Sequence, residues 1–141
     1  MITHLGHIAI LVTDLERSLD FYCNKLGLKE GFRLKNDKGE TWLVYVLIDE
    51  HNSIELFPGA NEKGERIQKT SGFNHICLLV DDINKTLAEI GKRGVDVRGE
   101  PKKGDDGNWQ YWVEDPDGNA IEFMQIMPDS LQAQAARRLF K

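Results

Sequence analysis

The sequence predicts an α+β fold of two tandem modules, each with the element order βαβββ, followed by a C-terminal helix. First, residues 6–14 (GHIAILVTD) of the 141-residue chain return as residues 74–82 (NHICLLVDD). Second, a helical pattern of apolar residues follows each copy, and alternating strand patterns separated by turns follow each helix. We expect a single domain over residues 1–127 with modules at about 4–57 and 73–127, and a helical extension over 128–141.

The first module begins with residues 4–12, whose apolar and β-branched character predicts a strand. Asp14 then caps a predicted helix, and Gly27 ends it. The apolar face of this helix consists of Leu15, Leu19, Tyr22 and Leu26. Predicted strands follow near residues 28–35, 41–49 and 52–57. The polar stretch 58–72 joins the modules and is expected to be a loop that can move over a site.

The second module repeats this plan from residue 73. A strand over 73–80 precedes a helix that Asp81 or Asp82 caps and Gly94 closes. The inward residues of this helix are Ile83, Leu87 and Ile90. Strands are predicted near 95–99, 108–114 and 119–126, and the turn Asp115-Pro116-Asp117-Gly118 joins the last two as a hairpin. In the extension, Leu131, Ala135 and Leu139 form one side of an amphipathic helix, for which we expect a packing or dimer-interface role.

Composition and charge narrow the possible partners. The formal net charge of −5 argues against nucleic acid or an anionic membrane as the main partner. No apolar run approaches the roughly 20 residues of a transmembrane helix. The first residues lack a basic segment and a cleavage site, so no signal peptide is expected and a cytoplasmic location is predicted. Cys23 and Cys77 fall in predicted helix and strand interiors and are interpreted as reduced core thiols.

Two histidines and two glutamates repeat in register with the modules. Glu55 lies 48 positions after His7, and Glu122 lies 47 positions after His75. Strand alternation places each of the four on one face of its strand, with apolar neighbours on the other face. A carboxylate in an apolar strand is costly to bury unless it is paired or coordinated, and two imidazoles with two carboxylates are typical of a divalent metal site. The alternative is four half-exposed polar residues on an open sheet face.

The chain resembles the vicinal oxygen chelate superfamily, whose best-known member is glyoxalase I. The resemblance covers about residues 4–127 and rests on GHIAILVTDLERSLDFYCNKLGL, NHICLLVDDI and EDPDGNAIEFMQI. It implies a curved mixed sheet and a metal ligand set of His7, Glu55, His75 and Glu122. One divalent ion would occupy each site, with Ni²⁺ or Zn²⁺ preferred and Co²⁺, Mn²⁺ or Fe²⁺ also compatible with these ligands.

The resemblance further implies a lactoylglutathione lyase-like lyase or isomerase. Such an enzyme acts on a small α-oxo or hemithioacetal substrate through a metal-stabilised enediolate, with Glu122 as the base and Glu55 as a second base in an epimerase-like scheme. Leu11 and Gly59 stand where bacterial glyoxalase I has an arginine and an asparagine that help hold glutathione, so the thiol cosubstrate stays open. An epimerase of the methylmalonyl-CoA type and a non-catalytic ligand-binding or resistance protein are the alternatives.

Other side chains are weaker candidates. Arg33, Arg66, Lys102 and Lys103 could serve an anionic substrate, although surface solvation is the simpler interpretation of each. Trp109, Tyr111 and Trp112 are interpreted as sheet packing, with a pocket wall as the alternative. A small-molecule substrate and a homodimer are expected. If two chains exchange modules, as in glyoxalase I, His7 and Glu55 of one chain would complete a site with the other two ligands of its partner.

Overall fold

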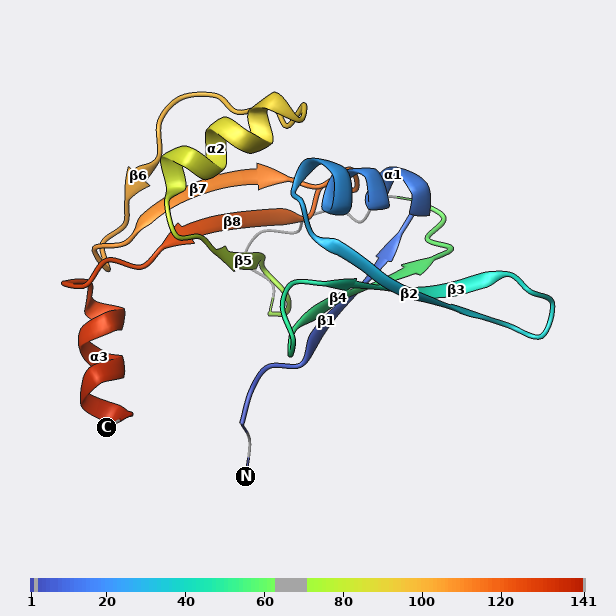
Figure 1. Cartoon of the computed structure of the whole chain (residues 1–141), viewed down its shortest axis with the longest axis horizontal. Coiled ribbons are helices and arrows are strands. Elements are labelled where there is room, and N and C mark those ends of the chain that lie inside the picture. The colour runs from blue at the N-terminus through green and yellow to red at the C-terminus, as the bar shows by residue number, and fades with distance from the viewer. Residues whose placement is uncertain (2, 63–70, 141) are drawn as a thin grey trace. The chain divides into compact units, whose positions relative to one another are not determined.

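The structure is a computed structural model that describes residues 1, 3–62 and 71–140. The chain divides into two compact units, one formed by residues 1–66 and 116–118 and the other by residues 67–115 and 119–141. Each unit contains one four-stranded mixed sheet with its own helices (Figure 1). The predicted pair of βαβββ modules and the C-terminal helix are therefore confirmed, and the eight strands of the described residues form two sheets that are not closed into a barrel.

The first unit has the strand order β1-β4-β3-β2. Its strands are β1 (His7–Val12), β2 (Lys29–Lys35), β3 (Thr41–Leu47) and β4 (Ser53–Pro58). Strand β1 pairs with β4 in parallel, and the other two pairings are antiparallel. The buried side chains include Tyr22, Val44, Val46, Ile54 and Leu56. Because Ile54 and Leu56 are buried on one face of β4, Glu55 between them belongs to the opposite face.

A helix connects β1 to β2. It consists of α1 (Leu15–Leu19) and a π-helical continuation, η1 (Asp20–Lys25). As predicted, the Asp14 side chain caps α1 by accepting a hydrogen bond from the Arg17 backbone N–H at 3.0 Å. Gly27 ends the helical segment with φ of +83°, which glycine adopts at little cost.

The turn Pro116–Gly118 belongs to the first unit although the chain on either side of it belongs to the second. The buried Asp117 carboxylate accepts hydrogen bonds from the Thr13 backbone N–H at 2.9 Å and from the Thr13 hydroxyl at 2.5 Å. Arg17 Nη2 donates a third at 3.2 Å. We call these contacts the Asp117 clasp. Through these contacts, a side chain more than 100 positions further along the chain holds the residues just before α1.

The second unit has the strand order β5-β8-β7-β6. Its elements are β5 (Ile76–Leu79), α2 (Ile83–Lys92), β6 (Lys102–Lys103), β7 (Trp109–Glu114), β8 (Ala120–Gln125) and α3 (Leu131–Leu139). Asp82 caps α2 by accepting from the Lys85 N–H at 2.9 Å. The predicted inward residues Ile83, Leu87 and Ile90 are buried, as are Ile121 and Phe123 of β8. Strands β5 and β8 run parallel, so the second unit repeats the pairing of β1 with β4.

The strand expected at residues 95–99 is absent from the described part of the second unit, where the pairing strand is the two-residue β6 instead. The backbone of Arg98 is held by a side chain: its N–H donates to the Tyr111 hydroxyl at 2.6 Å, and its carbonyl accepts from the same hydroxyl at 3.0 Å. Gly99, with φ of +77°, then turns the chain, and Pro101 has no N–H with which to pair. Because of these three features, the residues before β6 do not pair as a strand.

Helix α3 begins at a cap formed by Ser130, whose hydroxyl accepts from the Ala133 N–H at 3.1 Å. A fully buried amide, Asn108, ties the start of this helix to the sheet. Its Nδ2 donates to Asp106 Oδ2 at 2.7 Å and to Gln132 Oε1 at 3.0 Å, and its Oδ1 accepts from the Met127 N–H at 2.9 Å. None of the helical residues is itself buried. Over the described ranges, no helix has the length and apolar character needed to cross a membrane.

Candidate metal centre

The first predicted His–Glu pair lies on β1 and β4. The parallel register places His7 beside Ser53 and Ala9 beside Glu55, so the two side chains are diagonal neighbours on one face. His7 Nδ1 lies 3.4 Å from Glu55 Oε1. Glu55 is only 5% exposed, whereas the His7 side chain is 54% exposed. The pair therefore combines a buried carboxylate with an accessible imidazole.

The second pair lies at the equivalent place in the second unit. Strands β5 and β8 align Cys77 with Glu122, which puts His75, two residues earlier, in the position that His7 has relative to Glu55. His75 Nε2 lies 3.1 Å from Glu122 Oε2, and Glu122 is 6% exposed. Both pairs thus have the same pairing geometry and the same burial of the carboxylate.

The buried Glu55 carboxylate has an oxygen atom that a bound cation would stabilise. Its Oε1 atom is buried and has no hydrogen-bond partner among the described residues. A buried carboxylate oxygen without a partner costs more free energy than a neutral orphaned group, because its desolvation is not offset. The atom that lacks a partner is also the one that faces His7 Nδ1. A metal ion held between these two atoms would offset the desolvation.

The second pair differs in the hydrogen bonding of its imidazole. His75 Nδ1 lies 2.8 Å from Asn74 Oδ1, so this nitrogen carries a hydrogen and donates it to the amide oxygen. In the neutral imidazole, Nε2 then presents a lone pair to Glu122 Oε2. Two acceptors then face each other, and a proton or a metal ion between them would satisfy both. A metal-bound histidine commonly has its other nitrogen held in this way.

The separations also fit shared coordination. Two adjacent ligand atoms that each lie about 2.1 Å from one ion, at a right angle, are about 3 Å apart. The nitrogen–oxygen distances of 3.4 and 3.1 Å are close to this value. In residues 1, 3–62 and 71–140, His, Cys, Asp and Glu side chains do not gather in groups of three or more that could hold a metal ion. Each unit therefore presents one His–Glu pair whose separation would fit a shared divalent ion, and we call each pair a half-site.

Two aromatic residues lie beside the glutamates: Tyr45, which the sequence did not single out, and Trp112, for which a pocket wall was the alternative to sheet packing. Tyr45 of β3 pairs directly with Glu55, and Trp112 of β7 pairs directly with Glu122. Hydrogen bonding to Glu55 is the main cause that raises the pKa of Tyr45 above its usual value. Trp112 is 46% exposed and meets His75 edge-on, with ring centroids 4.7 Å apart, so sheet packing is an incomplete interpretation of this residue. A sequence signal does exist, because each aromatic residue lies ten positions before its glutamate.

The interpretation of Cys77 as a core thiol is wrong. Cys77 is exposed and lies on the face of His75 and Glu122, because residues two apart on a strand share a face. Partial burial, followed by the charge of Glu122 and a hydrogen bond with it, raises the pKa of the Cys77 thiol to about 12. The thiol is therefore protonated near neutral pH. Cys23 in η1 is half-buried.

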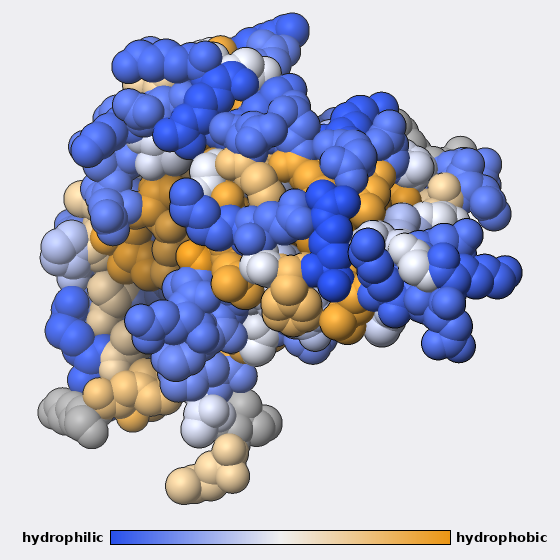
Figure 2. Space-filling view, turned by 45° about the vertical axis from the view of Figure 1, so that its right-hand side comes forward, coloured by the Kyte–Doolittle hydropathy of each residue, from blue (hydrophilic) through white to orange (hydrophobic). Residues whose placement is uncertain are grey.

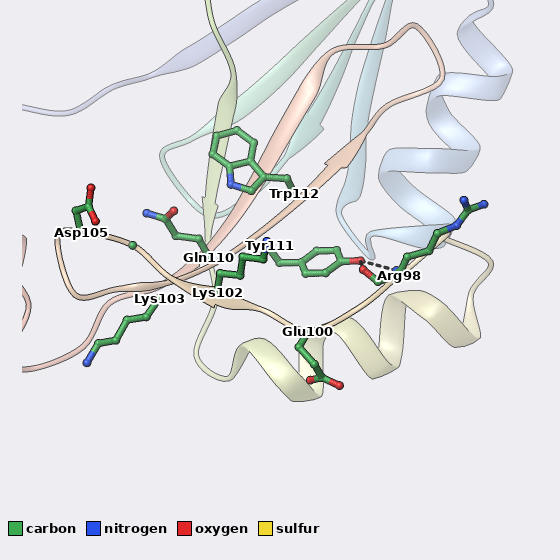
Figure 3. Close-up of a pocket in the computed structure, with 9 residues that line it drawn as sticks. Arg98, Glu100, Lys102, Lys103, Asp105, Gln110, Tyr111 and Trp112 are labelled. Carbon is green, nitrogen blue, oxygen red and sulfur yellow. Dashed lines mark hydrogen bonds between the residues drawn. The ribbon is translucent and has the colours of Figure 1, made fainter.

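The basic side chains considered as binding groups for an anionic substrate differ in their surroundings. Arg33 forms ion pairs with Glu30 at 2.6 Å and Glu16 at 2.9 Å, so surface pairing accounts for it. Lys102 and Lys103 are exposed and line a pocket of about 510 Å³ in the second unit (Figure 3). Trp112 also lines this pocket, which therefore shares a wall with the His75 half-site. Arg66 and the rest of residues 63–70 lie outside the described residues.

The site face of the first unit is apolar around its charged pair. Leu11 and Phe32 are exposed, and alternation and register place both on the face of Glu55. Figure 2 shows exposed apolar side chains in orange among hydrophilic ones in blue over the visible surface.

Comparisons with known proteins give relatives of this chain in sequence and in fold. The sequence profile of the Glyoxalase/Bleomycin resistance protein/Dioxygenase superfamily matches residues 4–123. A lactoylglutathione lyase from Neisseria meningitidis serogroup A is 36% identical over 123 residues, which span 86% of this chain and 89% of that protein. A mitochondrial methylmalonyl-CoA epimerase from Bos taurus is 26% identical over 103 residues, or 70% of this chain and 59% of the epimerase. The crystal structure of SMU.1112c, at 22% identity, matches 88% of this chain and 99% of its own with a TM-score of 0.75, which shows a shared fold.

Proposed function

Because the chain belongs to the Glyoxalase/Bleomycin resistance protein/Dioxygenase superfamily, we propose that it is a divalent-metal-dependent lyase or isomerase of the glyoxalase I type. One observation carries the proposal: each unit buries a carboxylate against an imidazole at an equivalent strand position. Relatives named lactoylglutathione lyase support the same reaction class. Fold alone would not distinguish the chemistries that this superfamily hosts.

The proposed metal ligands are His7, Glu55, His75 and Glu122. Imidazole and carboxylate together suit Ni²⁺ and Zn²⁺, which we expect to support activity best, and they also accept Co²⁺, Mn²⁺ and Fe²⁺. When bound, such an ion supplies Lewis-acid stabilisation of negative charge on substrate oxygens. The Asn74 side chain orients the His75 ring for this role through its 2.8 Å hydrogen bond.

We assign the proton transfer to Glu122. In an α-oxo hemithioacetal, the carbon that carries the hydroxyl and sulfur loses its proton to the Glu122 carboxylate. The electron pair left behind moves toward the neighbouring carbonyl. The same carboxyl group then returns the proton to that neighbouring carbon, and the hydroxyl proton moves to the former carbonyl oxygen, which gives a 2-hydroxy thioester isomeric with the substrate. The burial of Glu122 excludes water that would compete for the proton.

The hemithioacetal of methylglyoxal and glutathione is the first substrate to test. The protein is stripped of metal with EDTA, reloaded separately with Ni²⁺ or Zn²⁺, and assayed for formation of the thioester. We expect turnover only after reloading, and a loss of at least about 100-fold in kcat for Glu122→Gln, the size of a general-base contribution. Glu50→Gln removes a charge from an exposed turn residue and is the matched control, with activity expected to stay unchanged.

The outcomes separate the alternatives. Metal binding without turnover of this substrate would refute lactoylglutathione lyase activity and direct the search to other thiols or to acyl-CoA epimerisation. Failure of the folded protein to bind any of the metals would refute the proposed enzyme class and favour a ligand-binding protein. In neither case would the control variant differ from the wild type.

We further propose a homodimer in which each site takes one pair from each chain. Glu55→Gln and Glu122→Gln chains are mixed in equal amounts, unfolded and refolded together. Exchanged sites would leave one intact site in each mixed dimer and restore about a quarter of wild-type activity, by random pairing of the two chains. If each site lay within one chain, every site would lack one glutamate and no activity would return. Sedimentation of a fully active monomer would also refute the dimer.

A further inference from the structure

The two half-sites differ in which ligand they hold in place. In the second unit the imidazole is held, because Asn74 accepts from His75 Nδ1 at 2.8 Å and Trp112 packs edge-on against the same ring. In the first unit, by contrast, the His7 side chain is more than half exposed. The two half-sites also differ in the side chains that lie beside the carboxylates of Glu55 and Glu122.

Tyr45 is placed to hold Glu55. The antiparallel register of β3 and β4 makes Tyr45 the direct cross-strand partner of Glu55, so their side chains leave the sheet side by side. The Tyr45 ring stacks on Phe32 of β2, with centroids 4.3 Å apart and planes 21° from parallel. Phe32 is itself the direct partner of Tyr45 in the next pairing. The phenol is therefore fixed on one side by a ring and faces the carboxylate on the other.

The corresponding residue in the second unit cannot do the same. Trp112 is the direct partner of Glu122, but its ring lies against His75. The side chain directly beside Glu122 on β5 is Cys77, whose thiol is a much weaker hydrogen-bond donor than a phenol. In the first unit, Ala9 occupies the position of Cys77 and offers no polar atom. The polar side chains paired with the two buried glutamates thus differ in their strength as donors, a phenol beside Glu55 and a thiol beside Glu122.

We propose that Tyr45 is a positioning residue that fixes Glu55 as the permanent carboxylate ligand of the metal and leaves Glu122 as the carboxylate that can move to act as the base. The inference rests on the proposed function. In this role the phenol would donate to the Glu55 carboxylate and leave Oε1, which is buried without a hydrogen-bond partner and faces His7, directed at the metal position. A ligand held by such an outer hydrogen bond loses less entropy on binding. Tyr45 acts through Glu55 and does not contact substrate in this role.

The test is metal affinity, measured without turnover. Co²⁺ is titrated into metal-free protein in competition with a chelator, and binding is followed by visible absorption. For Tyr45→Phe we expect affinity about 10- to 100-fold below wild type, as for the loss of an outer partner of a metal ligand, and an altered Co²⁺ spectrum. Tyr111→Phe is the matched control, because it removes a phenol whose hydrogen bonds, among the described residues, go to the Arg98 backbone and not to a proposed ligand. Its Co²⁺ affinity should equal that of the wild type.

A double-mutant cycle ties the effect to Glu55. If Tyr45 acts through this carboxylate, Tyr45→Phe should not lower the affinity further in a Glu55→Gln background. Equal affinity and spectrum for Tyr45→Phe and wild type would overturn the inference while leaving the proposed function intact. An undiminished effect of Tyr45→Phe in the Glu55→Gln background would also overturn it. If the wild type binds no Co²⁺, Ni²⁺ or Zn²⁺, the proposed function fails, and this inference fails with it.

Discussion

Glu55→Gln should change the stability of the protein in opposite directions with and without metal. The wild-type carboxylate is 5% exposed, and one of its oxygens is buried without a hydrogen bond. Leaving a buried acceptor unsatisfied costs about 1–3 kcal/mol, and more when it is charged. The His7 contact recovers little, since an ion pair with an exposed partner contributes at most about 1 kcal/mol. In EDTA, we therefore expect the neutral amide to stabilise the fold by about 1–2 kcal/mol.

Bound metal should reverse the order of stability of the wild type and Glu55→Gln. A ligand at a free concentration 100 times its Kd stabilises the folded protein by about 2.7 kcal/mol. If Glu55→Gln weakens binding about 100-fold, the same concentration equals the variant's Kd and stabilises the variant by only about 0.4 kcal/mol. The wild type then gains about 2.3 kcal/mol more than the variant and becomes the more stable of the two.

The measurement is urea unfolding at pH 7, in EDTA and in a fixed excess of Zn²⁺ or Ni²⁺. Glu50→Gln makes the same chemical change at an exposed turn and should match the wild type closely in both conditions. A Glu55→Gln variant that is less stable than wild type in EDTA would refute the idea of an uncompensated buried oxygen. A wild type that gains no stability from metal would refute the half-site interpretation of His7 and Glu55.

Three further predictions concern the rest of the chain. Asn108→Ala removes the buried amide at the start of α3 and should lower the unfolding free energy by about 2–4 kcal/mol; a loss below about 1 kcal/mol would contradict its role. Tyr111→Phe leaves the Arg98 N–H and carbonyl without their partner and should cost about 1–3 kcal/mol in urea unfolding, whereas unchanged stability would show that water replaces the hydroxyl. Burial raises the pKa of Cys23, so in a Cys77→Ala background its thiolate fraction at pH 8 is lower in the folded than in the unfolded state. Alkylation by iodoacetamide should therefore be slower in the folded protein and approach the unfolded rate as pH rises through the folded pKa; equal rates at pH 8 would disprove this.

The repeat made most of the fold predictable. Because GHIAILV and NHICLLV introduce modules of the same pattern, strand and helix positions in one half supported those in the other. The expected strand at 95–99 failed for a tertiary reason. Val95 and Val97 have strand character, but the Tyr111 hydroxyl takes both backbone groups of Arg98, and no local pattern encodes that contact.

The His–Glu pairs were predictable because alternation and spacing depend only on sequence position. The partners Tyr45 and Asn74 were not, since their roles depend on the register of β3 with β4 and on side-chain torsions. Cys77 shows where two sequence rules conflict. Its apolar neighbours suggested a core position, whereas alternation with His75 placed it on the site face, and alternation was correct.

The Asp117 clasp bears on the order in which this protein can fold during synthesis. Thr13 leaves the ribosome 104 residues before the carboxylate that binds it, a delay of roughly 5–20 s at usual rates of translation. During that interval the nascent first module has strands β1 to β4 but no Asp117 beside the start of α1. Contacts of such large sequence separation form late, because closing the intervening loop costs entropy. The N-terminal module is therefore synthesised first but completed only after most of the second module has been made.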